Sequence, residues 1–101
     1  MKKLIALYTV PEDIDAFFAR YTAGHLPLVH KIPGLLGAEI TRIDRTLVGG
    51  EGNFLLVEMK FADANSFKTA MKSPEMGAAS GDVGEFAANR VTVMTGETLD
   101  L

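Results

Sequence analysis

The feature that most constrains this sequence is a pair of predicted strands that are apolar on both faces. In the segment Lys2 to Thr9, one face carries Leu4, Ala6 and Tyr8, and the other carries Ile5 and Leu7. The segment Phe54 to Phe61 is also apolar on both faces, apart from Glu58 and Lys60. Because successive side chains of a strand point to opposite faces of the sheet, both faces of these strands must be covered.

A helix is predicted between these two strands. A Pro-Glu-Asp motif at residues 11–13 opens it, with acidic side chains where the helix dipole favours them. Apolar residues then recur at spacings of three and four as far as Ile32. Gly24 and Pro27 interrupt this pattern, so we expect a kink or a break there, with Leu28 to Lys31 as a final turn.

The remainder of the chain predicts two more strands and a second helix. Leu36 to Ile43 and Arg90 to Thr95 have strand patterns, and the glycine-rich residues 44–53 form a hairpin connection. Residues 62–63 cap a helix that runs to about Met71. The segment Glu75 to Ala88 is rich in glycine and alanine and only weakly periodic. It predicts either short helical turns or a mobile lid.

The predicted order is therefore β-α-β-β-α-β, over a single domain of residues 1–101. This order indicates an α+β fold of the ferredoxin-like type, an antiparallel sheet with two helices on one face. The other sheet face is apolar as well, and exposing it costs many kcal/mol at roughly 25 cal/mol per Å². We therefore expect two copies to pack sheet against sheet in a two-fold homodimer.

Composition excludes several classes of protein. The formal charge is −3, and no basic stripe is present, which argues against a partner nucleic acid or an anionic membrane. No apolar run approaches the roughly 20 residues of a membrane span. The absence of cysteine excludes disulfides, thiolate metal sites and a cysteine nucleophile. The predicted location is the cytoplasm.

Several motifs resemble the EthD family over nearly the whole chain. The family-like residues are Phe17, Tyr21, His25, Pro27 and Leu28, then residues 31–35, 61–63 and 70–75, and finally Asp82 and Phe86. The resemblance implies a dimeric α/β barrel with a reaction site between the sheet and its own helices. It also implies a link to ethyl tert-butyl ether degradation or to polyketide-type chemistry.

His25 is the main candidate for a catalytic residue. An imidazole titrates near neutral pH and serves as acid, base or ligand, and His25 falls on the apolar stripe beside the Pro27 interruption. Tyr21 lies one turn earlier and can orient His25 or a substrate oxygen. The structural alternative is a core histidine that bonds a carbonyl freed by the proline, next to a core tyrosine.

Three more residues are candidates for ligand contact. Tyr8 reaches the same region from the first strand, and Phe17 precedes Tyr21 by one turn on the same stripe. Glu58 lies within an apolar strand, where burial raises a carboxyl pKa and makes it a base. The alternatives for Glu58 are a partner across the dimer interface or an exposed position at a strand edge. His30 falls on the other side of the helix and is expected at the surface.

No metal site or cofactor is predicted, because no set of His and carboxylate residues has ligand spacing and the glycines have no phosphate-loop spacing. Two hypotheses follow for function. In the first, the protein binds a small hydrophobic, oxygenated organic molecule and acts on it as a cofactor-free acid/base enzyme through His25. In the second, it is a non-catalytic accessory or structural homodimer. A ligand-sized apolar pocket beside His25 favours the first.

Overall fold

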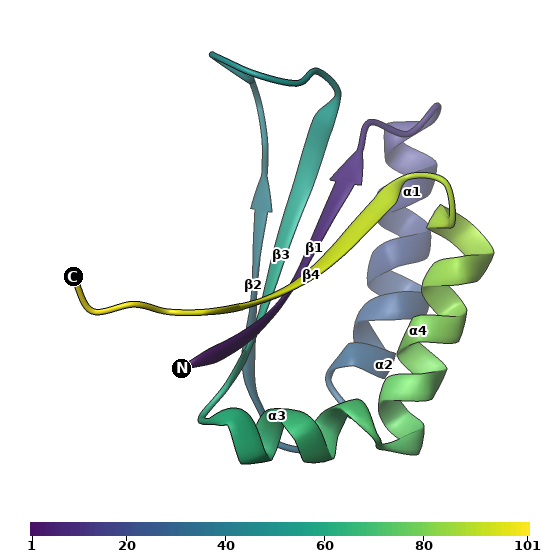
Figure 1. The fold of residues 1–101 in the computed structure, drawn as a ribbon. Coiled ribbons are helices and arrows are strands. Elements are labelled where there is room, and N and C mark those ends of the chain that lie inside the picture. The colour runs from purple at the N-terminus through teal and green to yellow at the C-terminus, as the bar shows by residue number, and fades with distance from the viewer.

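Four antiparallel strands form the single sheet of this protein (Figure 1). The computed structural model describes all residues 1–101. The strands are β1 (Lys2–Thr9), β2 (Leu35–Arg42), β3 (Asn53–Phe61) and β4 (Val91–Glu97), in the spatial order β2-β3-β1-β4. With the two doubly apolar strands at its centre, this arrangement confirms the predicted ferredoxin-like α+β fold.

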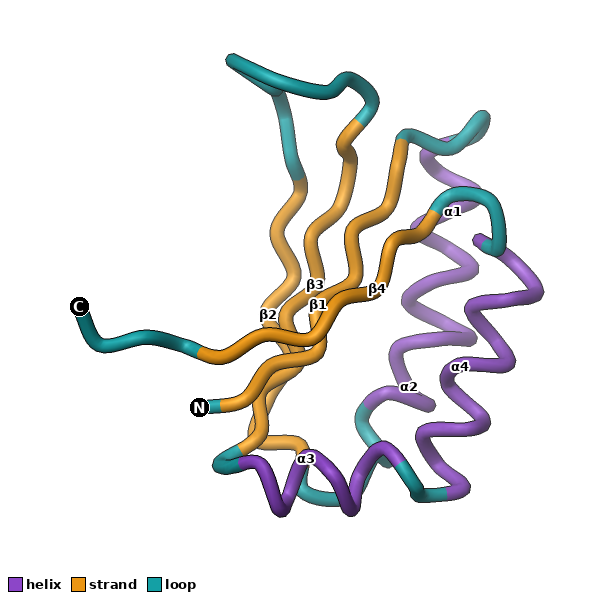
Figure 2. Tube along the Cα trace, in the orientation of Figure 1, coloured by secondary structure: helices purple, strands orange, loops and turns teal.

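The helices lie on one side of the sheet (Figures 1 and 2). The first helical segment consists of α1 (Ile14–Arg20), η1 (Tyr21–His25) and α2 (Leu26–Val29). The second consists of α3 (Ala64–Met71) and α4 (Pro74–Ala87). Figure 1 shows α3 across one end of the sheet, and α4 packs beside η1 and α2.

The interruption predicted near Gly24 and Pro27 is a π-helical turn rather than a break. The helix continues from α1 to α2 without a loop, and the N–H of Leu26 donates to the carbonyl of Tyr21. Pro27 has no N–H to donate, which weakens the regular hydrogen-bond ladder at this point. Single π-helical turns of this kind are frequent at functional sites.

The segment predicted as short turns or a mobile lid is one continuous helix, α4. Ser73 caps it, since its hydroxyl accepts from the N–H of Met76 at 3.1 Å, and Pro74 occupies the first helical turn. Glycine disfavours helix and obscured the pattern. Packing overrides that preference, because Met76, Ala79 and Ala87 are buried against the rest of the domain.

The core lies between the helices and the sheet. Strand register places Leu4 opposite Met59, Ala6 opposite Val57, and Tyr8 opposite Leu55. All six of these side chains are buried.

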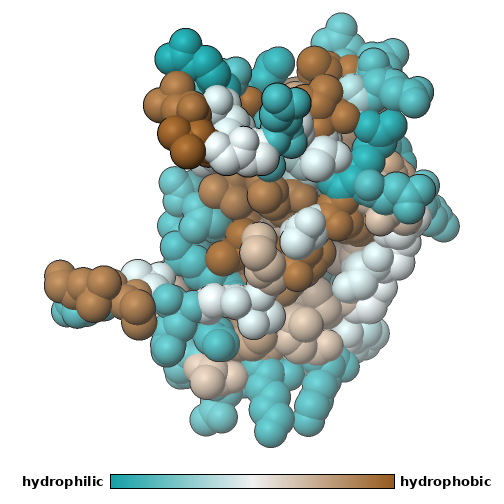
Figure 3. Space-filling model, turned by 45° about the horizontal axis from the view of Figure 1, so that its top comes forward, coloured by the Kyte–Doolittle hydropathy of each residue, from teal (hydrophilic) through white to brown (hydrophobic).

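The opposite face of the sheet has no covering element within the chain. Ile5, Leu7 and Leu56 are only half-buried there, and Met94 is exposed. Figure 3 shows one side of the molecule, on which apolar side chains gather in the middle and also lie along the upper edge and on the C-terminal tail. None of the helices has the length and hydrophobicity that a membrane span requires.

Candidate functional site

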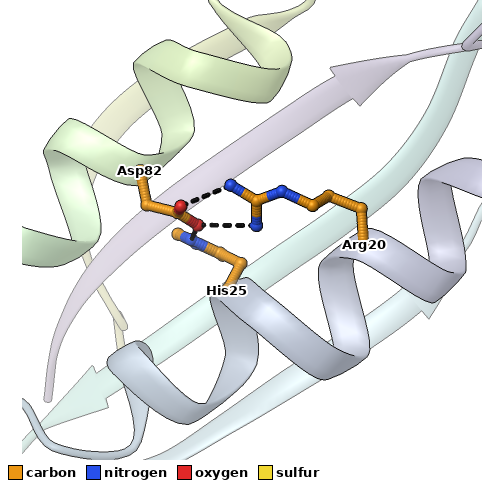
Figure 4. Close-up of polar contacts among 3 residues, drawn as sticks. All are labelled: Arg20, His25 and Asp82. Carbon is orange, nitrogen blue, oxygen red and sulfur yellow. Dashed lines mark hydrogen bonds and ion pairs between the residues drawn. The ribbon is translucent and has the colours of Figure 1, made fainter.

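The centre of the site is a contact between His25 at the end of η1 and Asp82 on α4 (Figure 4). The imidazole Nδ1 lies 3.0 Å from Asp82 Oδ2, and His25 is the one buried residue of the chain that is polar or charged. The π-helical turn carries His25, and the packing of α4 on η1 brings Asp82 to it.

Arg20 holds the other side of the Asp82 carboxylate (Figure 4). Its Nη1 donates to Oδ2 at 3.2 Å and its Nη2 to Oδ1 at 2.5 Å, which is a bidentate ion pair. Arg20 passes over Gly24, where an added Cβ would lie 2.5 Å from Nη1. The guanidinium also lies over the ring of Phe86, 4.9 Å from its centroid.

These contacts set the charges of the site. The Arg20 guanidinium, followed by His25, holds the pKa of Asp82 below its usual value, so Asp82 is an anion at neutral pH. Burial lowers the pKa of His25, and this outweighs the opposing effect of Asp82. His25 is therefore neutral at pH 7.

A carboxylate anion only accepts hydrogen bonds, so the contact with Asp82 requires a proton on His25 Nδ1. The other ring nitrogen, Nε2, then carries a free lone pair. Nε2 forms no hydrogen bond within the protein. Because every fully buried side-chain nitrogen or oxygen of the protein does have a hydrogen-bond partner, Nε2 must keep some accessible surface. An imidazole oriented by a carboxylate with Nε2 free is the arrangement of a general base.

His25 lines an apolar pocket of about 130 Å³ that lies between α4, α2 and the sheet. Its lining is Leu4, Tyr8, His25, Val29, Ile32, Met59, Met76, Ala79, Ser80, Val83 and Val93. Ser80 and Val93 are exposed, so the pocket opens between α4 and the edge strand β4.

Two tyrosines lie around His25. Tyr21 has its ring centroid 5.3 Å from the imidazole, and Tyr8 packs edge-on against Tyr21 at 5.9 Å. Burial and the nearby Asp82 raise the pKa of Tyr8 to about 12, and burial raises that of Tyr21, so both phenols keep their protons. Neither hydroxyl forms a hydrogen bond within the protein. Tyr8 lines the pocket and can donate to a ligand there, whereas Tyr21 packs behind His25 and does not line the pocket.

Of the other residues singled out from the sequence, two lie outside this pocket. Phe17 packs edge-on behind Tyr8 at 5.6 Å and lines a separate surface groove. Glu58 points to the opposite sheet face, where its Oε2 forms an ion pair with Lys3 Nζ at 2.9 Å. His30 is exposed, as expected.

Asp82 and Arg20 were not among the predicted site residues. The available signals were the spacing of four between Asp82 and Phe86, and the position of Arg20 immediately before Tyr21. No three His, Asp or Glu side chains lie close enough together to hold a metal ion.

Comparison with known proteins identifies relatives over most of the chain. An uncharacterised 11.0 kDa protein of Rhodococcus erythropolis, from the thcB–thcC intergenic region, is 29% identical over 94 residues, which is 93% of this chain and 91% of that protein. An EthD family protein from Bacillus halodurans, whose crystal structure is known, is 41% identical. The match covers 98% of this chain and 99% of that one with a TM-score of 0.90.

Two more distant crystal structures share the fold. A dimeric ferredoxin-like protein of unknown function from Thermobifida fusca has a TM-score of 0.65 at 19% identity, over 96% of this chain and 90% of that one. SnoaB, a cofactor-independent oxygenase from Streptomyces nogalater, has a TM-score of 0.67 at 14% identity, over 99% and 94% of the two chains. The family model for the EthD domain matches residues 11–90. The chain belongs to the EthD family.

Proposed function

We propose that this protein binds a small hydrophobic, oxygenated organic molecule in the pocket beside His25 and acts on it by acid/base chemistry. The observation that carries the proposal is the Asp82–His25 contact, 3.0 Å long, in the wall of an apolar pocket. A perturbed titratable group in such a pocket is the usual mark of a functional site. The family resemblance supports ether degradation or polyketide-type chemistry as the setting, and the cytoplasm stays the predicted location.

The proposed chemistry is a proton transfer through one nitrogen. Nε2 of His25 takes a proton from the ligand, either from a hydroxyl or from a carbon next to a carbonyl, and returns it later in the cycle. The imidazolium formed in between is stabilised by the Asp82 anion that its Nδ1–H contacts. Tyr8 keeps its proton and donates a hydrogen bond from its hydroxyl to the ligand oxygen. Arg20 and Asp82 act as positioning residues, because neither lines the pocket.

The proposal includes a homodimer built on the open sheet face. Ile5, Leu7 and Leu56 share that face with Met94, and a second copy placed sheet to sheet removes them from water. The dimeric ferredoxin-like protein of Thermobifida fusca supports this assembly. Analytical ultracentrifugation at low micromolar protein is expected to give twice the mass of the 10.9 kDa chain, and a folded monomer contradicts it.

A panel of one-ring oxygenated compounds, followed by NMR, tests the binding function. The panel contains phenol, anisole and cyclohexanone, and the readout is the shift of the His25 ring signals and of the backbone amides of Ala79 and Ser80. At least one compound is expected to shift them, and His25→Asn is expected to weaken that binding while the fold is kept. A panel in which no compound shifts these signals favours the accessory or structural homodimer instead.

A further inference from the structure

We infer that the ligand of this pocket is a neutral, one-ring phenol whose hydroxyl lies between His25 Nε2 and the Tyr8 hydroxyl. The inference rests on the proposed function and narrows its ligand class. Three properties of the site lead to it: the direction of its hydrogen bonds, the absence of a free cation, and its size and wall chemistry.

The site offers one acceptor and one donor. His25 Nδ1 uses its proton on Asp82, so Nε2 is an acceptor. Tyr8 lines the same pocket with a protonated hydroxyl that has no partner in the protein. A ligand hydroxyl satisfies both groups, because it donates to Nε2 and accepts from Tyr8. A carbonyl or ether oxygen accepts only, which leaves Nε2 without a partner.

The charge of the site favours a neutral ligand. The pocket lining contains no lysine or arginine, and both terminal nitrogens of the nearby Arg20 are bound to Asp82. Removing a carboxylate from water without a positive partner carries a large penalty. The Asp82 anion behind His25 adds repulsion against any negative ligand.

Size and wall chemistry favour an aromatic ring. An apolar cavity of roughly 150 Å³ accepts benzene in another protein, and the pocket here measures about 130 Å³. Met59, Met76 and Tyr8 are among the residues that line it. Sulfur and aromatic groups both contact a flat polarisable ring favourably.

An NMR titration with five probes of similar size tests the inference. Phenol is expected to bind, anisole and toluene to bind about tenfold more weakly for want of the donated hydrogen bond, and benzoate not to bind at all. If anisole or the acceptor-only cyclohexanone binds as tightly as phenol through His25, the ligand class is wrong while the proposed function stands. If none of these compounds binds, both fail.

Two variants assign the discrimination to the named atoms. His25→Asn keeps a group that can donate to Asp82 but removes Nε2, so phenol and anisole are expected to bind equally weakly. Tyr8→Phe keeps the ring and removes only the hydroxyl donor, so the affinity for phenol is expected to fall several-fold. A full preference for phenol in both variants overturns the assignment.

Acid pH provides an independent check on the same atoms. The titratable and charged groups that surround the imidazole are Asp82 on α4, Arg20 on α1, Tyr21 on η1 and Tyr8 on β1. The pKa of the imidazole itself is lowered from 6.5 by burial, so its protonation is expected only as the pH falls below that value, and protonation converts Nε2 from acceptor to donor. Phenol is expected to lose its advantage over anisole as His25 protonates, and a preference that persists contradicts the inference.

Discussion

The two helical segments that enclose the site contribute in different ways. The α1–η1–α2 segment provides the base and an aromatic surround, in which Tyr21 and His25 are almost fully buried. Helix α4 is rich in glycine and alanine, yet it provides Asp82, which fixes the tautomer of that base. The comparison indicates that the first segment determines which chemical group faces the pocket, and α4 determines the state in which that group is held.

The largest expected effect is on the stability contributed by the first segment. Tyr21→Ala removes a side chain that is 2% exposed and packs on Phe17, Tyr8 and His25, so a loss of roughly 3–5 kcal/mol is expected in urea unfolding. Tyr21→Phe is the matched control. It removes only an unpartnered hydroxyl, and a loss above about 1 kcal/mol there would show that the hydroxyl is used within the fold.

The corresponding change on α4 is expected to have a smaller effect on stability and a specific effect on His25. Asp82→Asn replaces the anion that contacts Arg20 and His25, at a cost on the order of 1–3 kcal/mol. It also removes the contributions that raise the pKa of His25, so that pKa is expected to fall further. Arg20→Met is expected to move the pKa of His25 the opposite way. Shifts of the same sign in both variants would refute this electrostatic account.

The pH dependence of stability tests the buried histidine directly. Because burial lowers the pKa of His25 below 6.5, the unfolded chain binds this proton more readily than the folded one. Stability is therefore expected to be full above about pH 6.5 and to fall as the pH drops below it. Asp82 adds a further loss only below its ordinary pKa of 3.8. His25→Asn removes the first slope, whereas the exposed His30→Asn leaves it unchanged.

The smallest effects come from two glycines, one on each segment. Gly84 on α4 is exposed and has open space around an added Cβ, so Gly84→Ala is expected to stabilise by about 0.5–1 kcal/mol. Gly24→Ala places its Cβ against Arg20, whose flexible end moves away from Asp82. For Gly24→Ala we therefore expect little change in stability and a higher pKa of His25. Equal gains in stability with no change at His25 would show that Arg20 is not held over Gly24.

The sequence predicts most of the fold because its strands and first helix follow strong apolar periods. The doubly apolar strands centre the sheet, and the spacing of Tyr21 and His25 places them on the buried side. Helix α4 was missed as a continuous helix because its glycines weaken the pattern that packing later overrides.

The ion pairs were harder to predict from local pattern. The contact of Asp82 with Arg20 joins residues 62 positions apart, and that of Glu58 with Lys3 joins residues 55 apart. Their geometry depends on helix packing and on strand register, and neither of these can be predicted from the apolar periodicity of one sequence. The face taken by Glu58 follows from the pairing of β1 with β3.

The most direct test of the account is the tautomer and charge of His25, measured by the nitrogen chemical shifts of its imidazole during a pH titration. The account predicts a neutral ring at pH 7 with the proton on Nδ1, a pKa below 6.5, and loss of that fixed tautomer in Asp82→Asn. A ring that is charged at pH 7, or neutral with its proton on Nε2, would contradict the central claim that Asp82 holds His25 as a base facing the pocket.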